Sequence, residues 1–202
     1  MKLGILGGTN LAISLGNKYL DAGLDVSFGV RKEFEIKEIG WKVLNLFRNK
    51  VVSIEEAIGK SNIILICCEN EYLKMFIGKL KSADLEGKIL IDCTNSTFYK
   101  VLECNLIRSQ IRHIPLFKAF NNFGLDYPKS DSMGVIKETY LCGENGTEKS
   151  KVKKLIELIG YRAIDSGGID NAALLEAFYH LRKEITLNKI EKSDYHFKLI
   201  SC

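Results

Sequence analysis

Short apolar runs alternate with longer amphipathic stretches along the chain. The runs predict strands, which cover residues 3–6, 25–30, 62–68, 88–93, 113–118, 139–142 and 161–164. The amphipathic stretches predict helices over residues 10–22, 71–80, 147–160 and 171–189, and a short one after Ser53, which has a capping-box partner in Glu56. This alternation is typical of βαβ units. We therefore expect an α/β fold with a doubly wound, mostly parallel Rossmann-type sheet and a C-terminal helix.

The same pattern suggests a domain organisation. It indicates a helix over residues 32–39, a strand over 41–47 and an extended tail over 195–200. The length of 202 residues fits one domain with an appendage, and no change of composition marks a second domain. We predict a Rossmann-type domain over residues 1–168. The helix and tail of residues 169–202 would then pack on this domain or on a partner subunit.

Composition narrows the class of protein. Hydrophobic residues make up 46% and charged residues 27%, which is ordinary for a soluble globular protein. The net charge of +4 would favour an anionic ligand but gives no argument for nucleic acid. No stretch has the ~20 apolar residues that cross a bilayer. We expect a cytoplasmic protein without membrane contact.

The six cysteines show no spacing that is typical of metal ligands, so no metal site is expected. In a reducing compartment they are most simply small, mostly buried apolar residues.

The turn after the first strand carries the strongest local signal. A strand leads through Gly7, Gly8, Thr9 and Asn10 into a helix, which is the context that a dinucleotide pyrophosphate requires. Thr9 stands where the fingerprint has its second glycine, and its hydroxyl could compensate by bonding a phosphate oxygen. The alternative is a tight turn that binds no ligand.

The end of the second strand bears on the choice of cofactor. NAD-binding proteins usually carry an acidic residue there, which holds the ribose 2′-hydroxyl. This chain has Val30, Arg31 and Lys32 instead. A guanidinium can bind a 2′-phosphate, so the pattern favours NADP. The alternative is that the two cations only solvate a loop.

Four segments together resemble a known family. They are residues 4–11, residues 29–31, residues 92–95 with 118–121, and residues 141–143 with 160–167. The ordered set is similar to the NADP-binding fold of NADPH:deazaflavin-coenzyme oxidoreductases and of the cytosolic domain of STEAP-type ferric reductases. One departure is Val30, which replaces a family serine.

The resemblance implies roles for particular residues. Gly7, Gly8, Thr9, Asn10 and Leu11 would hold the pyrophosphate. The residues at the second strand's end, Val30, Arg31 and Lys32, would surround the 2′-phosphate. Cys67 and Cys68 would lie beside the adenosine or the ribose, and Asn95 near the nicotinamide ribose. The nicotinamide side of the site would be lined by Ala119, Phe120 and Asn121.

No residue is assigned as catalytic. His113, His180 and His196 are isolated in the sequence, and Asp92 and Asp165 are expected to cap turns. Lys118 could face the cofactor or extend its amine to solvent. The chain shows no large helical domain for a substrate pocket, so the site would be shallow or completed by a partner subunit.

Two classes of function remain open. One is an oxidoreductase that moves hydride between NADPH and a flavin or deazaflavin, a small-molecule acceptor acting as second substrate. The reaction needs mainly alignment of two ring systems. The other is a non-catalytic NADP-binding module, such as a redox sensor or assembly partner. The apolar residues of the last helix could pack on their own sheet or form a homodimer interface.

Overall fold

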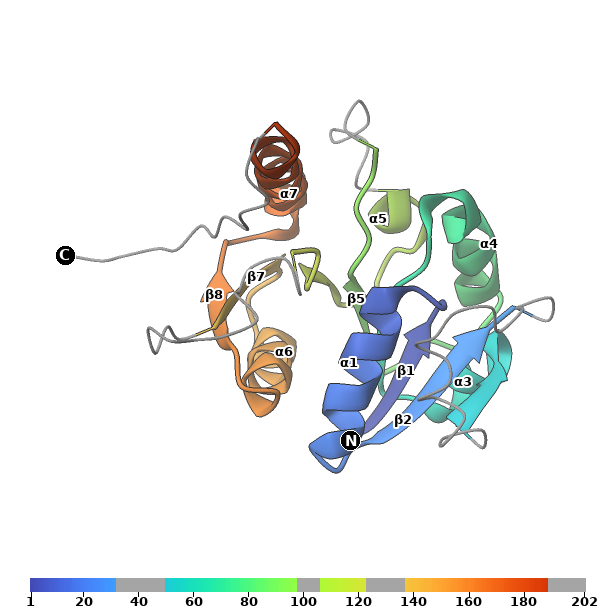
Figure 1. Ribbon diagram of the computed structural model, residues 1–202. Helices are drawn as coiled ribbons and strands as arrows, with labels where there is room; N and C mark the ends of the chain where they lie inside the picture. Colours follow the sequence, from blue (N-terminus) through green and yellow to red (C-terminus); the bar gives the residue numbers. More distant parts are fainter. Residues whose placement is uncertain (32–49, 98–105, 123–136, 189–202) are drawn as a thin grey trace. The chain divides into compact units, whose positions relative to one another are not determined.

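The computed structural model describes residues 1–31, 50–97, 106–122 and 137–188 (Figure 1). The chain forms two compact units. The first comprises residues 1–94 and 106–117, and the second comprises residues 95–105 and 118–202. The boundary predicted at residue 168 falls inside the second unit and stays a prediction.

The first unit is built on parallel strands in the order β3-β2-β1-β4-β5. They are β1 (Lys2–Leu6), β2 (Asp25–Val30), β3 (Val51–Ser53), β4 (Ile63–Ile66) and β5 (Ile89–Asp92). Leu6, the last residue of β1, is in register with Gly29 on one side and Ile66 on the other. The carboxyl ends of β1, β2 and β4 therefore meet at one edge, where ligands bind in sheets of this kind.

Helices cover both faces of this sheet (Figure 1). Helix α1 (Asn10–Asp21) packs on the face that carries Phe28, so closely that a Cβ on Gly16 would lie 2.1 Å from the Phe28 ring. The opposite face carries α3 (Ile54–Lys60), α4 (Asn70–Lys81) and α5 (Leu106–Gln110). Here a Cβ on Gly29 would lie 2.9 Å from that of Ala57 in α3.

The second unit contains a βαβ element followed by the last helix. Strands β7 (Glu138–Gly143) and β8 (Arg162–Asp165) are parallel neighbours joined through α6 (Thr147–Leu158). A 3₁₀ turn, η3 (Ile169–Asn171), leads into α7 (Ala172–Leu187). Strand β6 (Leu116–Ala119) lies where the chain passes from the first unit into the second.

The predicted fold class is confirmed: the strand pairs β1–β2, β1–β4, β2–β3, β4–β5 and β7–β8 are parallel, helices cover both faces of the first unit's sheet, and a C-terminal helix is present. The predicted helix after Ser53 is also confirmed, because the Ser53 hydroxyl accepts a hydrogen bond from the Glu56 N–H at 3.1 Å. Strand β3 was not predicted. The elements expected at residues 32–39, 41–47 and 195–200 lie outside the described residues.

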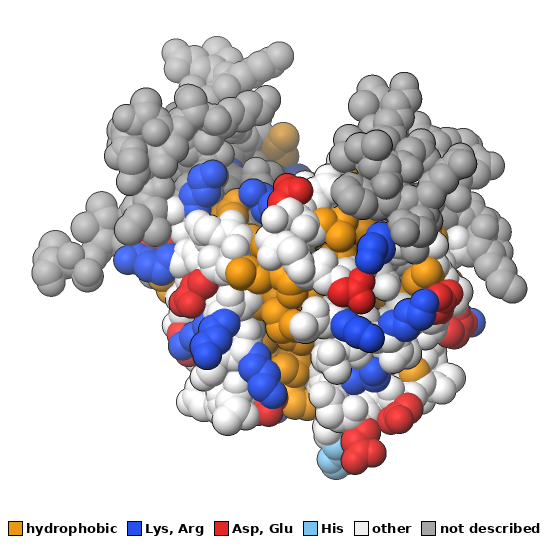
Figure 2. Space-filling view, turned by 90° about the horizontal axis from the view of Figure 1, so that it is seen from below, with side chains coloured by type: hydrophobic (Ala, Val, Ile, Leu, Met, Phe, Trp, Pro, Cys, Tyr) orange, Lys and Arg blue, Asp and Glu red, His pale blue; other side chains and the backbone are white. Residues whose placement is uncertain are grey.

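Figure 2 shows one face of the surface, on which lysine and arginine side chains are interspersed with aspartate and glutamate. In the described ranges no helix is long and apolar enough to cross a membrane. The same residues hold no group of histidine, cysteine or acidic side chains that could bind a metal ion. Four cysteines of the described residues are buried, as expected, and none of them is in a disulfide: Cys67, Cys68, Cys93 and Cys142.

Candidate functional site

The turn after β1 is closed against the end of β4. Gly7 has a φ of +116°, a conformation that L side chains rarely adopt, and a Cβ there would lie 2.4 Å from the carbonyl oxygen of Cys67. Its N–H donates to the carbonyl of Gly29 at the end of β2, at 3.0 Å. Glycine is therefore required at this position by both backbone conformation and space.

Thr9 is the N-cap of α1. Its hydroxyl donates to the Cys67 carbonyl oxygen at 2.8 Å and accepts from the Ala12 N–H at 3.2 Å. A hydroxyl has one proton, so this proton is already used and the expected bond to a phosphate oxygen is not available in this arrangement. Backbone N–H groups at the start of α1 could bind a phosphate oxygen instead. Those of Asn10 and Leu11 have no acceptor within the described part of the chain.

A pocket opens beside this turn. It is lined by the turn after β1, the end of β2 with the residue that follows it, and the N-cap and second turn of α4, namely Gly7, Gly8, Val30, Arg31, Glu69 and Phe76. The guanidinium carbon of Arg31 lies 3.6 Å from the centre of the Tyr72 ring. Four residues predicted to surround the cofactor's phosphates thus share one pocket. Lys32 lies outside the described residues.

Sequence reasoning missed the contribution of α4. Glu69 is the N-cap residue of this helix, and Tyr72 lies in its first turn. Their position in the sequence could have indicated these two residues, because residues 69–72 follow the carboxyl end of β4, which is the strand next to β1. Because the cation Arg31 is expected at the same edge of the sheet, the aromatic residue Tyr72 is a candidate for a cation–π contact with it.

Cys67 and Cys68 follow β4 and are both buried. Cys67 contributes its carbonyl group to the turn, as described above. Burial raises the pKa of the Cys68 thiol to about 12, and the nearby negative charges of Asp92 and Glu69 act in the same direction. Cys68 therefore stays a neutral thiol and is a poor nucleophile.

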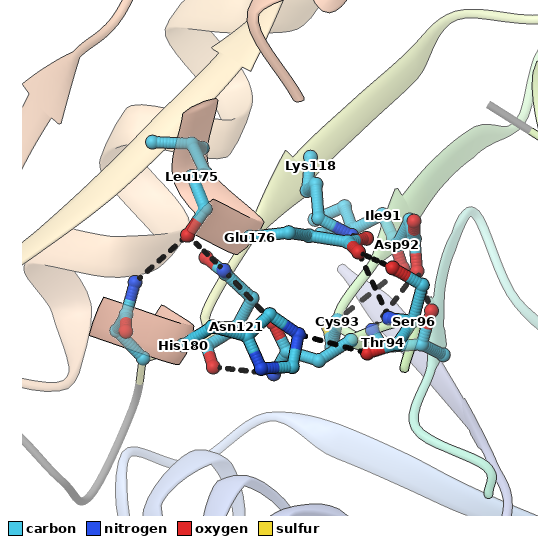
Figure 3. Close-up of polar contacts among 12 residues, drawn as sticks. Ile91, Asp92, Cys93, Thr94, Ser96, Lys118, Asn121, Leu175, Glu176 and His180 are labelled. Carbon is cyan, nitrogen blue, oxygen red and sulfur yellow. Dashed lines mark hydrogen bonds and ion pairs between the residues drawn. The ribbon is translucent and has the colours of Figure 1, made fainter. Parts of the chain in front are cut away.

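In the second unit, the predicted residues Asn95 and Asn121 lie together. The Asn95 amide donates to the Asn121 carbonyl oxygen at 2.8 Å, and the Asn121 amide donates to Asn95 Oδ1 at 3.1 Å. The Asn121 amide also donates to the carbonyl oxygen of Leu175 in α7, at 2.9 Å (Figure 3). Two segments that lie 26 residues apart in the sequence are thus fastened to each other and to the last helix.

Ala119 and Phe120, also predicted to line the nicotinamide side, are fully buried. Phe120 has a φ of +63°, a left-handed conformation that is unusual for a bulky residue. Backbone strain of this kind persists where the surroundings hold it in place. The side-chain bonds of Asn121, the next residue, supply such a restraint.

Lys118 forms a buried ion pair that the sequence did not predict. Its amine lies 2.6 Å from Glu176 Oε1, and the two side chains are 0% and 1% exposed. The other carboxylate oxygen of Glu176 accepts from the Ser96 N–H at 2.8 Å and from the Ser96 hydroxyl. The Lys118 amine therefore does not reach solvent. Glu176 could have been noticed as a single carboxylate in the apolar run at the start of α7.

His180, Asp92 and Asp165 have structural roles. A ring nitrogen of the buried His180 lies 3.0 Å from the Ser96 carbonyl oxygen. Asp92 and Asp165 cap turns as expected, accepting from the Thr94 and Gly167 N–H groups at 2.9 Å each. His113 lies in a turn with a φ of +68°, and His196 is outside the described residues.

Comparisons with known proteins add to this geometry. Residues 2–96 match the family described as NADP oxidoreductase, coenzyme F420-dependent. The chain is 24% identical to the F420-dependent NADP reductase of Methanothermobacter marburgensis, over 87% of this chain and 88% of that protein. It is also 24% identical to rat metalloreductase STEAP3 over 87% of this chain, but it spans only 36% of the length of STEAP3.

Solved structures show the same fold. A protein from Arthrobacter sp. FB24, described as an F420-dependent NADP reductase, superposes over 100% of both chains with a TM-score of 0.80 at 16% identity. An imine reductase from Aspergillus terreus superposes with a TM-score of 0.64 at 16% identity, over 92% of this chain and 61% of that one.

These similarities agree with the resemblance that the sequence motifs indicated. Residues 2–96 include the phosphate turn, Arg31 and the pocket of the first unit. Over residues 2–96, the chain is thus similar to the coenzyme F420-dependent NADP oxidoreductases.

Proposed function

We propose that the protein is an oxidoreductase that binds NADP(H) and moves hydride between NADPH and a flavin or deazaflavin. The observation that carries the proposal is Arg31. It directly follows β2, where an acidic residue would select NAD, and it lines one pocket with Gly7 and Gly8. A planar guanidinium at this place matches a ribose 2′-phosphate.

The first unit would hold the phosphates of the cofactor. Free N–H groups in the first turn of α1 and the positive end of that helix suit the pyrophosphate. Gly7 lets the turn lie against β4 without a side chain in between. Arg31 would bind the 2′-phosphate, with Lys32 as a predicted second cation.

The residues of the second unit would orient the nicotinamide. Asn95 and Asn121 brace each other next to the buried Ala119 and Phe120, so this segment offers a fixed wall rather than an acid–base group. The cofactor supplies the hydride when bound, and an aromatic ring acceptor needs alignment and exclusion of water more than a proton donor. The chemistry expected of these residues is therefore positioning.

A non-catalytic NADP-binding module is the second candidate. One observation favours it: Lys118, Glu176 and His180 are all engaged in bonds within the second unit. These side chains do not present a proton to a substrate. A cytoplasmic location and a homodimer remain predictions for either candidate.

Stopped-flow oxidation of NADPH separates the two candidates. The wild-type protein is mixed with NADPH and, in separate runs, with a deazaflavin, with FMN or with no acceptor. We expect oxidation that depends on an acceptor and saturates with NADPH. Saturable binding of NADPH with no acceptor-dependent oxidation would favour the binding module.

A substitution tests the choice of cofactor. Arg31→Ala removes charge-assisted hydrogen bonds and should weaken NADPH binding by about 10- to 150-fold, with little effect on NADH. Lys50→Ala is the matched control, because Lys50 pairs with Asp25 at the opposite end of β2. Equal losses for both cofactors in Arg31→Ala would overturn the assignment to the 2′-phosphate.

A further inference from the structure

The aromatic ring under Arg31 has no role in the function proposed above. The Arg31 guanidinium carbon lies 3.6 Å from the centre of the Tyr72 ring, which is van der Waals contact with the ring face. A cation over a tyrosine face is attracted by the negative charge of the π system. The N–H donors of a guanidinium lie in its plane, so contact through one face leaves the donors at the edges available.

Tyr72 is held in place by side-chain packing and by a main-chain hydrogen bond. It is partly buried and packs against the apolar cluster between the sheet and α3, α4 and α5. Its N–H donates to the Glu69 carbonyl oxygen at 3.0 Å in the first turn of α4. The ring is therefore a fixed platform, whereas Arg31 follows the last residue of β2 and is only partly buried.

A competing partner for Arg31 lies close by. Glu69 lines the same pocket as Arg31, and its side chain is exposed. No ion pair between the two is present among the described residues. A flexible arginine next to a carboxylate would be expected to pair with it for part of the time. With the guanidinium plane held on the Tyr72 ring, that pair does not form, and the edge donors face a pocket that an anionic ligand could enter.

We propose that Tyr72 is a specificity-determining residue, which holds the Arg31 guanidinium in place so that a dinucleotide with a 2′-phosphate is preferred. The inference rests on the proposed binding of NADP(H). It adds that the preference depends on the aromatic face of Tyr72 as well as on the charge of Arg31. The hydroxyl of Tyr72 has no part in it.

The test measures binding of nucleotides that correspond to the adenosine end of the dinucleotide. Isothermal titration calorimetry compares 2′,5′-ADP with 5′-AMP, which differ only in the 2′-phosphate. We expect Tyr72→Leu to lower the preference for 2′,5′-ADP by about three- to tenfold, as loss of a cation–π contact implies. Tyr72→Phe keeps the ring and is the matched control, with a preference within about twofold of wild type.

A double-mutant cycle measures the contribution of the contact between Arg31 and Tyr72. Lysine in place of Arg31 keeps the charge but not the planar group, so Tyr72→Leu should have a smaller effect in an Arg31→Lys background. Thermal melts check the fold of each variant, and Tyr72→Met replaces Tyr72→Leu if the latter does not fold. An unchanged preference in the folded variant lacking the ring would overturn the inference. So would a loss in Tyr72→Phe as large as that in Tyr72→Leu.

The result also separates this inference from the proposed function. If wild type prefers 2′,5′-ADP and the preference survives loss of the ring, only the role of Tyr72 is wrong. If wild type shows no preference between the two nucleotides, the assignment to NADP and the role of Tyr72 both fail.

Discussion

At the scale of single residues, Thr9 combines two tasks. Its hydroxyl caps α1 through the Ala12 N–H and also bonds the Cys67 carbonyl oxygen that follows β4. One side chain thus connects the start of the first helix to a neighbouring strand of the sheet. A glycine at this place would permit closer approach of a phosphate but would supply neither bond.

Loss of the Thr9 hydroxyl should therefore affect stability. Thr9→Val keeps the shape but removes the cap and leaves a buried carbonyl group without its donor. We expect a loss of about 1–2 kcal/mol in the free energy of unfolding, measured by urea denaturation.

Thr9→Ser retains the hydroxyl and serves as the control, with a loss of less than about 1 kcal/mol. Equal stability of the valine variant and wild type would show that the two hydrogen bonds contribute little.

At the scale of elements, a buried ion pair joins the end of β6 to α7. Lys118 and Glu176 are almost completely removed from solvent, and each neutralises the other. Since the carboxylate also accepts from Ser96, three segments of the second unit depend on one side chain. Such a pair stabilises little compared with apolar packing, but loss of one partner leaves an uncompensated charge.

Substitutions of this pair should be strongly non-additive. Lys118→Met leaves the buried Glu176 carboxylate without its counter-charge and should reduce the free energy of unfolding by about 3–5 kcal/mol. Adding Glu176→Gln removes that charge and keeps an acceptor for the Ser96 N–H, so the double variant should be more stable than Lys118→Met alone. Denaturant unfolding of both variants measures this. A double variant less stable than Lys118→Met would contradict the buried-charge argument.

The individual elements also show how much of the fold and of the candidate site the sequence could predict. The apolar run at residues 63–66 is long enough to predict a buried strand. The roles of Gly7 and Arg31 could be predicted from the neighbouring residues in the sequence, since each directly follows a predicted strand. Strand β3 has only Val51–Ser53, which is too short to show a period, and it exists through pairing with β2. Tyr72 and Glu176 were missed because packing, rather than spacing, brings them to their partners.

At the scale of the whole molecule, acid stability depends on charges such as Asp165. Burial alone would raise its pKa, but hydrogen bonds from Lys149, Lys153 and the Gly167 N–H outweigh it and lower the pKa to about 2. The two amines lie 2.7 and 2.9 Å from the carboxylate oxygens, and they tie α6 to the end of β8. Folding is linked to the ionised form of this group.

The stabilisation from Asp165 should be complete at neutral pH and should decline as the pH falls from about 4 to about 2, because the folded-state pKa lies below the ordinary value of 3.8. Thermal melts across this range should show a shallower loss of stability for Asp165→Asn than for wild type. Asn in place of the exposed Asp21 is the control and should follow the wild-type curve. Parallel curves for wild type and Asp165→Asn would contradict the assigned pKa.

The carbonyl group of Cys67 has a consequence for how this chain can vary. Gly7 lies against it and Thr9 donates to it, so residue 67 serves the turn through its main chain, and its sulfur takes no part in either contact. Relatives could exchange the cysteine for another small residue and keep the turn intact. Position 7 requires glycine and position 9 requires a side-chain hydroxyl, so in divergent sequences we expect drift at 67 alongside glycine at 7 and threonine or serine at 9.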